Sequence, residues 1–334
     1  MTRRRLPTTY KVLIRSSYKS GPMRDSPAVL ITGSSGMIGT ALVKRLLADG
    51  ISVRGVDRCA NRWSDSVDEV TDQVDLLEPG AANQLPADAD YIVHLAAHSR
   101  VRDLVEDPSG AEENLRTLLT ALEYARLSDA DLIFTSSREV YGDQGNTVYA
   151  EADAGVRDVK NPYGASKVGG EALVASYGEC YDLRTCTLRL SNVYGRYDDY
   201  NRVIPTFVAL ADRGEDLTVY GGDKLLDFLY LDDCVDALVG AMERIDAVQG
   251  EVLNIGSGEG HSLLHLAELI VDRVNTDIDV TVDSDRPGEV DRFVADVSRS
   301  RRLMDFEPSY SMPEGLSKTV SWYLDRPDLL DDIL

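Results

Sequence analysis

The chain contains 334 residues, 43% of them hydrophobic, which is enough for one large domain or two modest ones around a buried core. Its net charge of −22 and its pI near 4.5 exclude nucleic acid and anionic membranes as general partners. No apolar stretch is long enough to cross a membrane and the first residues lack the apolar middle of a signal peptide, so we expect a soluble, cytoplasmic protein.

Residues 1–26 differ from the rest of the chain because they carry seven basic side chains and one acidic one. We expect a disordered extension, an over-long start with Met23 as the true first residue, or a basic arm that binds a partner. Only 7 of the 35 basic residues are lysine, and this acid-rich, lysine-poor composition resembles that of proteins from salt-loving organisms.

Short β-branched runs alternate with helical patterns from Ala28 to residue 195. This alternation predicts βαβ units and a doubly wound, Rossmann-type parallel sheet, with ligands at the carboxyl ends of the strands. The predicted strands are 28–33, 52–57, 91–97, 131–137 and 184–195, and the predicted helices are 37–49, 109–127 and 161–180.

The pattern is looser in the last part of the chain. We predict helices at 203–213, 232–244, 262–274 and 313–324, and strands at 217–221 and 252–255. We therefore expect an α/β fold with a Rossmann domain over residues 27–191. Residues 192–334 should form mainly a smaller, partly interleaved α/β substrate lobe, with some segments that return to the first domain.

A glycine-rich turn follows the first predicted strand. The stretch "VLITGSSGMIG" places Gly33, Gly36 and Gly39 between a strand and a helix, with Met37 and Ile38 among them. The backbone amides of such a turn approach a pyrophosphate closely, and the helix N-terminus adds a partial positive charge. The turn therefore predicts a dinucleotide site.

An acidic residue follows at the spacing that such a site needs. The next strand ends in Asp57, eighteen residues after Gly39, where a carboxylate binds the adenosine ribose hydroxyls. Because an acid repels a 2′-phosphate, we predict NAD rather than NADP as the cofactor. Arg58, beside it, weakens this preference.

The stretch "NPYGASK" carries a candidate catalytic pair. Asn161 is a helix cap and Pro162 the first helical residue, so Tyr163 and Lys167 lie four apart on one helical face. A phenol titrates near pH 10 in water. A neighbouring ammonium and an oxidised nicotinamide would lower that pKa enough for tyrosinate to act as a base.

The four cysteines and four histidines do not predict a metal site. The cysteines make no CxxC pair, which disfavours zinc and disulfides, and we expect buried, unreactive thiols. His261 and His265 are four residues apart, but no HExxH pattern includes them. We expect His94 to take part in packing and His98 to line a pocket.

Taken in their order along the chain, the motifs of this sequence resemble those of the extended short-chain dehydrogenase/reductase family, in its nucleotide-sugar epimerase and dehydratase branch. The likeness covers residues 28–325 and rests on "TGSSGMIG", "HLAA", "TSSREVYG", "NPYGASK", "RLSNVYG", "DFLYLDDCVDAL", "RPGE" and "TVSWY". Such a series is far more specific than any single motif. The resemblance implies an NAD-dependent homodimeric enzyme that acts on a nucleotide sugar.

The resemblance also implies roles for individual residues. Besides the glycine-rich turn and the Tyr163–Lys167 pair, the cofactor contacts would be Asp75 and Leu76 at the adenine, Ala96 and Ala97 along the cofactor, and Asn114. The substrate contacts would be Ser137 at the reacting sugar hydroxyl, Arg138 and Glu139 beside it, and Asn192 and Arg286 at the diphosphate.

Two positions depart from the family pattern. Leu226 stands where an arginine usually precedes "DF" and contacts the sugar nucleotide. Arg196 or Arg202 either replaces that arginine or is a solvated surface charge. Arg138 stands where the family's 4,6-dehydratases have an aspartic acid that, with the next glutamate, eliminates water.

The second departure bears on the reaction. A guanidinium cannot deliver the proton that elimination needs, so we do not expect dehydration. Glu139 is then either an ion-paired structural residue or a substrate contact. Arg138 either pairs with Glu139 or reaches an anionic substrate.

The reaction that we predict is 4-epimerisation of a nucleotide sugar, most simply of the UDP-glucose/UDP-galactose type, through a transient 4-keto intermediate. Tyr163 would take the proton from the C4 hydroxyl, and Ser137 would relay or orient it. A UDP-glucuronate decarboxylase or a 4-ketosugar reductase of the same family is the alternative enzyme. The non-enzyme alternative is an NAD-binding assembly or sensor protein.

Overall fold

The computed structural model describes residues 27–222, 224–274, 277–284 and 292–334. Two predictions lie outside these residues. They are the basic extension at residues 1–26 and the diphosphate contact at Arg286.

A seven-stranded sheet forms the centre of the molecule, with the strand order β11-β7-β5-β4-β1-β2-β3. Every pair of neighbouring strands is parallel. The strands are β1 Ala28–Thr32, β2 Ser52–Asp57, β3 Thr71–Gln73, β4 Tyr91–His94, β5 Asp131–Ser137, β7 Thr185–Leu190 and β11 Val252–Ile255. This topology confirms the Rossmann-type prediction.

Helices cover both faces of the large sheet because successive residues of its strands point to opposite sides. In β1, Ile31 packs with Leu42 and Leu238, which belong to α2 (Met37–Ala48) and α8 (Leu231–Glu243). The preceding residue, Leu30, packs with Leu118 of α5 (Ser109–Ser128) and Val174 of α6 (Pro162–Tyr181). The strands are therefore apolar on both faces, as a buried parallel sheet requires.

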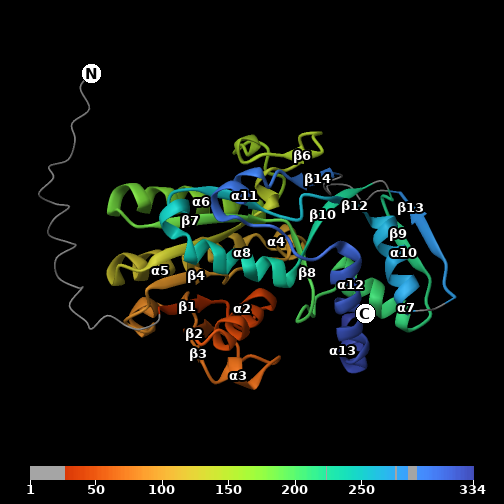
Figure 1. Ribbon diagram of the computed structural model, residues 1–334, viewed down its shortest axis with the longest axis horizontal. Coiled ribbons are helices and arrows are strands. Elements are labelled where there is room, and N and C mark those ends of the chain that lie inside the picture. Colours follow the sequence, from red (N-terminus) through yellow and green to blue (C-terminus); the bar gives the residue numbers. More distant parts are fainter. Residues whose placement is uncertain (1–26, 223, 275–276, 285–291) are drawn as a thin grey trace, which may run out of the picture.

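A second lobe is built around a five-stranded sheet of β12, β10, β14 and β6, with β8 paired to β10. A two-stranded parallel sheet of β9 and β13 lies beside α7 and α10 at one end of the molecule (Figure 1). The strands are β6 Val148–Tyr149, β8 Asn192–Tyr194, β9 Leu217–Tyr220, β10 Leu225–Tyr230, β12 Gly260–Ser262, β13 Val280–Asp283 and β14 Arg292–Ala295. The main helices are α7 Val203–Asp212, α10 Leu263–Val274, α12 Met312–Leu324 and α13 Pro327–Ile333.

The two lobes exchange segments. Strand β6 precedes residue 192 and pairs with β14 of the second lobe, whereas β11 follows residue 192 and is the edge strand of the large sheet. The chain thus crosses between the lobes several times. The shorter helical elements are α3 Asp65–Asp68, η1 Ala81–Gln84, α4 Val101–Glu106, η2 Arg138–Val140, η3 Glu151–Asp153, α9 Ile245–Val248 and α11 Ser298–Met304.

The seven predicted helices are found within one or two residues of their expected bounds, but one predicted strand is wrong. Residues 184–195 form two strands, because the chain leaves the large sheet after Leu190 and pairs with β10 from Asn192 onward. The expectation of four buried thiols is also wrong, since Cys59 and Cys180 are exposed. Over the described part of the chain, no helix has the length and apolar character to cross a membrane.

Candidate active site

The glycine-rich turn between β1 and α2 is shaped by close backbone contacts. Gly33 has a φ of +75°, and a Cβ there would lie 2.7 Å from the Ala96 nitrogen. A Cβ on Gly39 would lie 2.1 Å from the Gly33 carbonyl oxygen. Gly36 caps α2 without a side-chain hydrogen bond, and the first helical turn contains no acidic residue. The helix N-terminus is therefore open to an anionic group such as a pyrophosphate.

Asp57 stands at the end of β2 with its carboxylate turned to this loop. Its Oδ2 accepts a hydrogen bond from the Ser35 amide (3.0 Å), and its Oδ1 accepts one from the Cys59 amide (3.0 Å). These two bonds orient the carboxylate beside the glycine-rich turn. The geometry fits the predicted contact with the adenosine ribose and so fits NAD.

A single cavity of about 1170 Å³ joins the candidate cofactor and substrate positions. Every predicted site residue that the structure describes lines this cavity, so the fold brings together residues from eight segments of the chain. They are Gly33, Gly36, Met37, Ile38, Gly39, Asp57, Asp75, Leu76, Ala96, Ala97, Asn114, Ser137, Arg138, Glu139, Tyr163, Lys167 and Asn192. His98 also lines it, and His94 is buried in the sheet beneath.

The candidate catalytic pair lies at the start of α6. Asn161 caps this helix by accepting a hydrogen bond from the Gly164 amide (2.8 Å), and Pro162 is its first residue, as predicted. Lys167 is buried and donates from Nζ to the Thr135 carbonyl oxygen (2.8 Å). Its Nζ lies 5.6 Å from the centre of the Tyr163 ring. Both side chains are thus held at the carboxyl end of β5.

Burial dominates the acidity of both groups. It raises the pKa of Tyr163 to about 12, against a smaller lowering by the Ser137 hydroxyl. It lowers the pKa of Lys167 to about 8, against a smaller raising by Glu171. The lowered phenol pKa that we expected is therefore not a property of these side chains alone, because loss of solvation outweighs the nearby charges. A tyrosinate needs further positive charge in the site.

Arg138 is paired rather than free. Its Nη2 lies 3.0 Å from Glu139 Oε1, and its Nε donates to Asn192 Oδ1 (2.8 Å). Glu139 is buried, and its Oε2 accepts a further hydrogen bond from Asn161 Nδ2 (2.8 Å). Of the two expected roles for Glu139, the structure supports the ion-paired structural one. The pair also connects Asn192 to the residue that caps α6.

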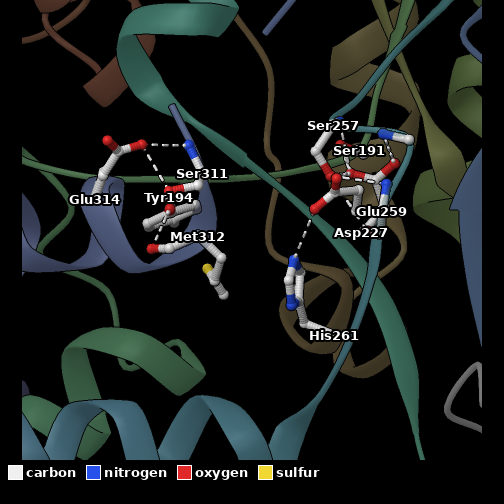
Figure 2. Close-up of polar contacts among 10 residues, drawn as sticks. Ser191, Tyr194, Asp227, Ser257, Glu259, His261, Ser311, Met312 and Glu314 are labelled. Carbon is white, nitrogen blue, oxygen red and sulfur yellow. Dashed lines mark hydrogen bonds and ion pairs between the residues drawn. The ribbon is translucent and has the colours of Figure 1, made fainter. Parts of the chain in front are cut away.

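Asn192 is held from its other side by a buried aspartate. Its Nδ2 donates to the carbonyl oxygen of Asp227 (2.8 Å), which is 0% exposed. Figure 2 shows the side chains of Ser191 and Ser257 gathered around the Asp227 carboxylate. That carboxylate accepts five hydrogen bonds, from Ser191 Oγ, the Ser257 amide and Oγ, and the amides of Gly258 and Ala295. Asp227 therefore fixes the point at Ser191 where the chain leaves the large sheet and enters the second lobe.

The two candidate replacements for the missing arginine differ. Arg202 lines the cavity, where it is ion-paired with Asp198 (3.6 Å), whereas Arg196 is ion-paired with Asp232 (2.7 Å) outside it. Leu226, at the departing position, packs among apolar side chains of the second lobe. Arg202 is thus the candidate that is placed to meet a substrate.

Apart from Arg202, sequence reasoning missed a loop that lines the cavity. Residues 197–202 line it, and Asn201 Oδ1 accepts a hydrogen bond from Arg100 Nη2 (2.6 Å). Asp199 forms an ion pair with Arg62, which lies beside the cofactor position. The one available signal was the polar run "RYDDYNR" directly after the "NVYG" motif. Among the described residues, no cluster of three or more His, Cys, Asp or Glu could hold a metal.

Comparison with known proteins agrees with this geometry. The sequence profile of the NAD dependent epimerase/dehydratase family matches residues 29–256. The low-salt glycan biosynthesis protein Agl12 of Haloferax volcanii is 33% identical over 89% of this chain and 98% of its own length. The UDP-glucose 4-epimerase of Mycolicibacterium smegmatis is 30% identical over 89% of this chain and 98% of its own.

Solved structures give the same result. A UDP-glucose 4-epimerase from Thermotoga maritima, crystallised with UDP-glucose, superposes with a TM-score of 0.82 at 27% identity, covering 89% of this chain and 99% of that one. Curated relatives also include a dTDP-glucose 4,6-dehydratase and a UDP-N-acetylglucosaminuronate decarboxylase. The matches confirm the resemblance seen in the motifs, and they include relatives with several different reactions.

Proposed function

Since this chain belongs to the NAD-dependent epimerase/dehydratase family, we propose that it is a nucleotide-sugar 4-epimerase of the UDP-glucose/UDP-galactose type. Family membership also confirms NAD as the cofactor. The observation that carries the proposal is the arrangement of side chains at the carboxyl end of β5. There Ser137 faces Tyr163, and Arg138 is paired with Glu139.

The proposed chemistry begins at Tyr163. Its hydroxyl would take the proton from the C4 hydroxyl of the sugar, and Ser137 would hydrogen-bond that same hydroxyl. NAD⁺, when bound, would supply the hydride acceptor and the positive charge that the buried phenol lacks. Lys167, held by the Thr135 carbonyl, would keep a second positive charge near the ring and bind the nicotinamide ribose.

The cofactor would be held by groups already in place. The glycine-rich turn and the open N-terminus of α2 suit the pyrophosphate, and Asp57 suits the adenosine ribose. On the substrate side, Asn192 and Arg202 line the cavity and carry donors for a diphosphate. This division leaves the carboxyl end of β5 between cofactor and sugar.

The pairing of Arg138 favours epimerisation over elimination. A 4,6-dehydratase needs an acid at this position and a second carboxylate free to act with it. Here the first group is a guanidinium, and both oxygens of the second are engaged, by Arg138 (3.0 Å) and by Asn161 (2.8 Å). Water loss from C5 and C6 therefore has no proton donor among these two side chains, and the carboxylate that would accept the C5 proton is held in an ion pair.

The test is proton NMR of the purified protein incubated separately with UDP-glucose, UDP-galactose and dTDP-glucose. We expect interconversion of the first two and no new methyl doublet from any of the three. A 6-methyl doublet would show dehydration and overturn the proposal. Release of CO₂ from UDP-glucuronate would instead support the decarboxylase alternative, in which Arg138 would lie near a carboxylate.

A cytoplasmic homodimer remains part of the proposal. Leu127 of α5 and Tyr181 of α6 are 55% and 49% exposed on neighbouring helices, which supports association through this surface. Light scattering of the purified protein and of a Leu127→Asp variant tests it. A monomeric unmodified protein would contradict it.

A further inference from the structure

A buried ion pair lies next to the proposed catalytic residues. Glu171 follows Lys167 by one turn of α6, and Arg189 lies on β7; their side chains are 14% and 7% exposed. The guanidinium donates from Nε to Oε1 (2.9 Å) and from Nη2 to Oε2 (2.7 Å). Two parallel hydrogen bonds of this kind hold the carboxylate in one orientation.

Glu171 also binds the strand that carries the reaction. Its Oε1 accepts a hydrogen bond from Ser136 Oγ (2.5 Å). The residue before Ser136 supplies the carbonyl that binds Lys167, and the residue after it is Ser137, whose hydroxyl interacts with Tyr163. The Ser136–Glu171 bond therefore ties α6 to the short stretch of β5 that contacts both catalytic side chains of α6.

Arg189 extends the same network to η2, the short helical turn that contains Arg138 and Glu139. Its Nη1 donates to the Tyr141 hydroxyl (3.0 Å) and to the Glu151 carbonyl oxygen (2.8 Å). Tyr141 directly follows that turn, and its own hydroxyl donates to Asn254 Oδ1 (2.5 Å) on β11. The ion pair thus supports the end of β5 from α6, β7 and β11 together.

The negative charge of Glu171 acts on Lys167 as well. It raises the pKa of Lys167, which burial holds down at about 8. The other titratable groups that face Lys167 are Tyr163 on α6 and His94 on β4, whose pKa burial lowers to about 3. His94 is therefore neutral near pH 7, and Glu171 favours the ammonium form.

We propose that Glu171 is a positioning residue for the reaction. Through Ser136 and Arg189 it holds the end of β5 against α6 and maintains the charge of Lys167, without touching substrate or cofactor. The inference rests on the proposed function, because it assumes that Tyr163 and Lys167 act in catalysis. It adds a buried ion pair to the groups on which turnover depends.

Two variants test it, with one matched control. Glu171→Gln keeps the size of the side chain and removes its charge, but leaves Arg189 without an ionic partner. Ser136→Ala removes one neutral hydrogen bond and should fold even if Glu171→Gln does not. The control is Glu123→Gln, since Glu123 forms a more exposed ion pair with Arg126 and also bonds α6 through Tyr177.

We expect both test variants to lower kcat about 10-fold or more with little change in KM, because small displacements of reacting groups are costly. In Glu171→Gln, the loss of activity at high pH should begin at a lower pH, since Lys167 gives up its proton more readily. NAD⁺ binding followed by tryptophan fluorescence should show the same shift, and Glu171→Asp should restore part of both. Trp63 lines the cavity and reports binding without turnover.

The outcomes separate the two proposals. If folded Ser136→Ala and Glu171→Gln proteins keep the kcat and pH profile of the unmodified enzyme while Tyr163→Phe is inactive, Glu171 has no positioning role. If Tyr163→Phe keeps full activity, the proposed function itself fails. An equal loss in Glu123→Gln would show a general effect of removing a carboxylate from this helix pair and would also overturn the inference.

Discussion

The cofactor end and the substrate end of the cavity are built in different ways. The glycine-rich turn and Asp57 come from one stretch of 25 residues, Gly33 to Asp57, and their contacts are mostly between backbone groups and one carboxylate. At the substrate end, Arg138 reaches Asn192, 54 residues away, and Asn192 binds Asp227, 35 residues further on. The first end depends on local chain geometry, and the second on packing between lobes.

This difference separates the cofactor contacts, which members of a family can share, from the substrate contacts, which can differ between members. The cofactor end needs only a turn, a helix start and an acid at the right spacing, so its chemistry is shared across a family. The substrate end is a chain of contacts from the Asp227 backbone carbonyl through the side chains of Asn192, Arg138 and Glu139 to Asn161. A change of one residue there alters several partners, so reaction type can diverge while the cofactor stays the same.

The largest effect should come where the two ends meet. Tyr163→Phe should lower turnover by about 10²- to 10⁴-fold, because it removes the proposed acid and base, while NAD binding and folding stay intact. Steady-state kinetics and NAD titration of the purified variant measure this. Tyr310→Phe, at a half-buried tyrosine outside the cavity, is the control and should be fully active. Unchanged turnover in a folded Tyr163→Phe protein would end the assignment.

The next effect concerns the substrate end. Arg138→Gln leaves the buried Glu139 carboxylate without its ionic partner, which should lower the free energy of unfolding by about 2 kcal/mol and reduce activity. The control is Arg54→Gln at the cofactor lobe, where the partner Asp72 is 39% exposed and the expected loss is about 0.5 kcal/mol. Urea unfolding of both variants gives the comparison. Equal losses would mean that the Arg138 pair is no more than a surface contact.

A smaller effect is expected at the cofactor end. Asp57→Ala should shift the preference between NAD and NADP by about 10-fold toward NADP, since no carboxylate then faces the 2′ position. Calorimetric titration with both dinucleotides measures the shift. Asp49→Ala, an exposed acid at the end of α2, serves as the control. Tighter binding of NADP by the unmodified protein would show that Asp57 was misread.

The sequence predicted the cofactor end well because its signals are local. Periodicity located the strands and helices, the glycine spacing located the turn, and the Asn161 cap located the start of α6. All three depend on residues within a few positions of one another. The predicted site residues of the described chain therefore all line the cavity, although their cofactor and substrate roles stay predictions.

The contacts that the sequence did not predict are long-range. Strand β10 was missed because Asp227 interrupts its apolar run, and only the fold supplies five donors for that carboxylate. The strand predicted at 184–195 ends early because residues from Asn192 onward pair with β10, and no property of Ser191 itself predicts this. The ion pair between Arg62 and Asp199 joins residues 137 apart and follows no spacing rule.

The smallest expected effect concerns how burial of His94, in the sheet beneath the cofactor end, makes stability depend on pH. His94 is 2% exposed, its Nδ1 lies 2.8 Å from Thr32 Oγ1, and burial lowers its pKa from 6.5 to about 3. Between these two values, the unfolded chain binds a proton that the folded chain does not, so stability falls as the pH falls below about 6.5. The contribution of His94 should decrease by about 1 kcal/mol from pH 6.5 to 5.5.

His94→Gln removes this titration while keeping a side chain that can bond Thr32. The variant is therefore expected to lose about 1 kcal/mol less than the unmodified protein over that interval, whatever its stability at pH 7. Carboxylates that titrate nearby do so in both proteins, so the difference between their urea-unfolding curves isolates His94. His265→Gln, at a half-exposed histidine of α10, should follow the unmodified protein. Parallel pH dependence in the His94→Gln protein would mean that His94 is protonated in the folded state, and that the sheet beneath the cofactor site is less well sealed from water than its burial implies.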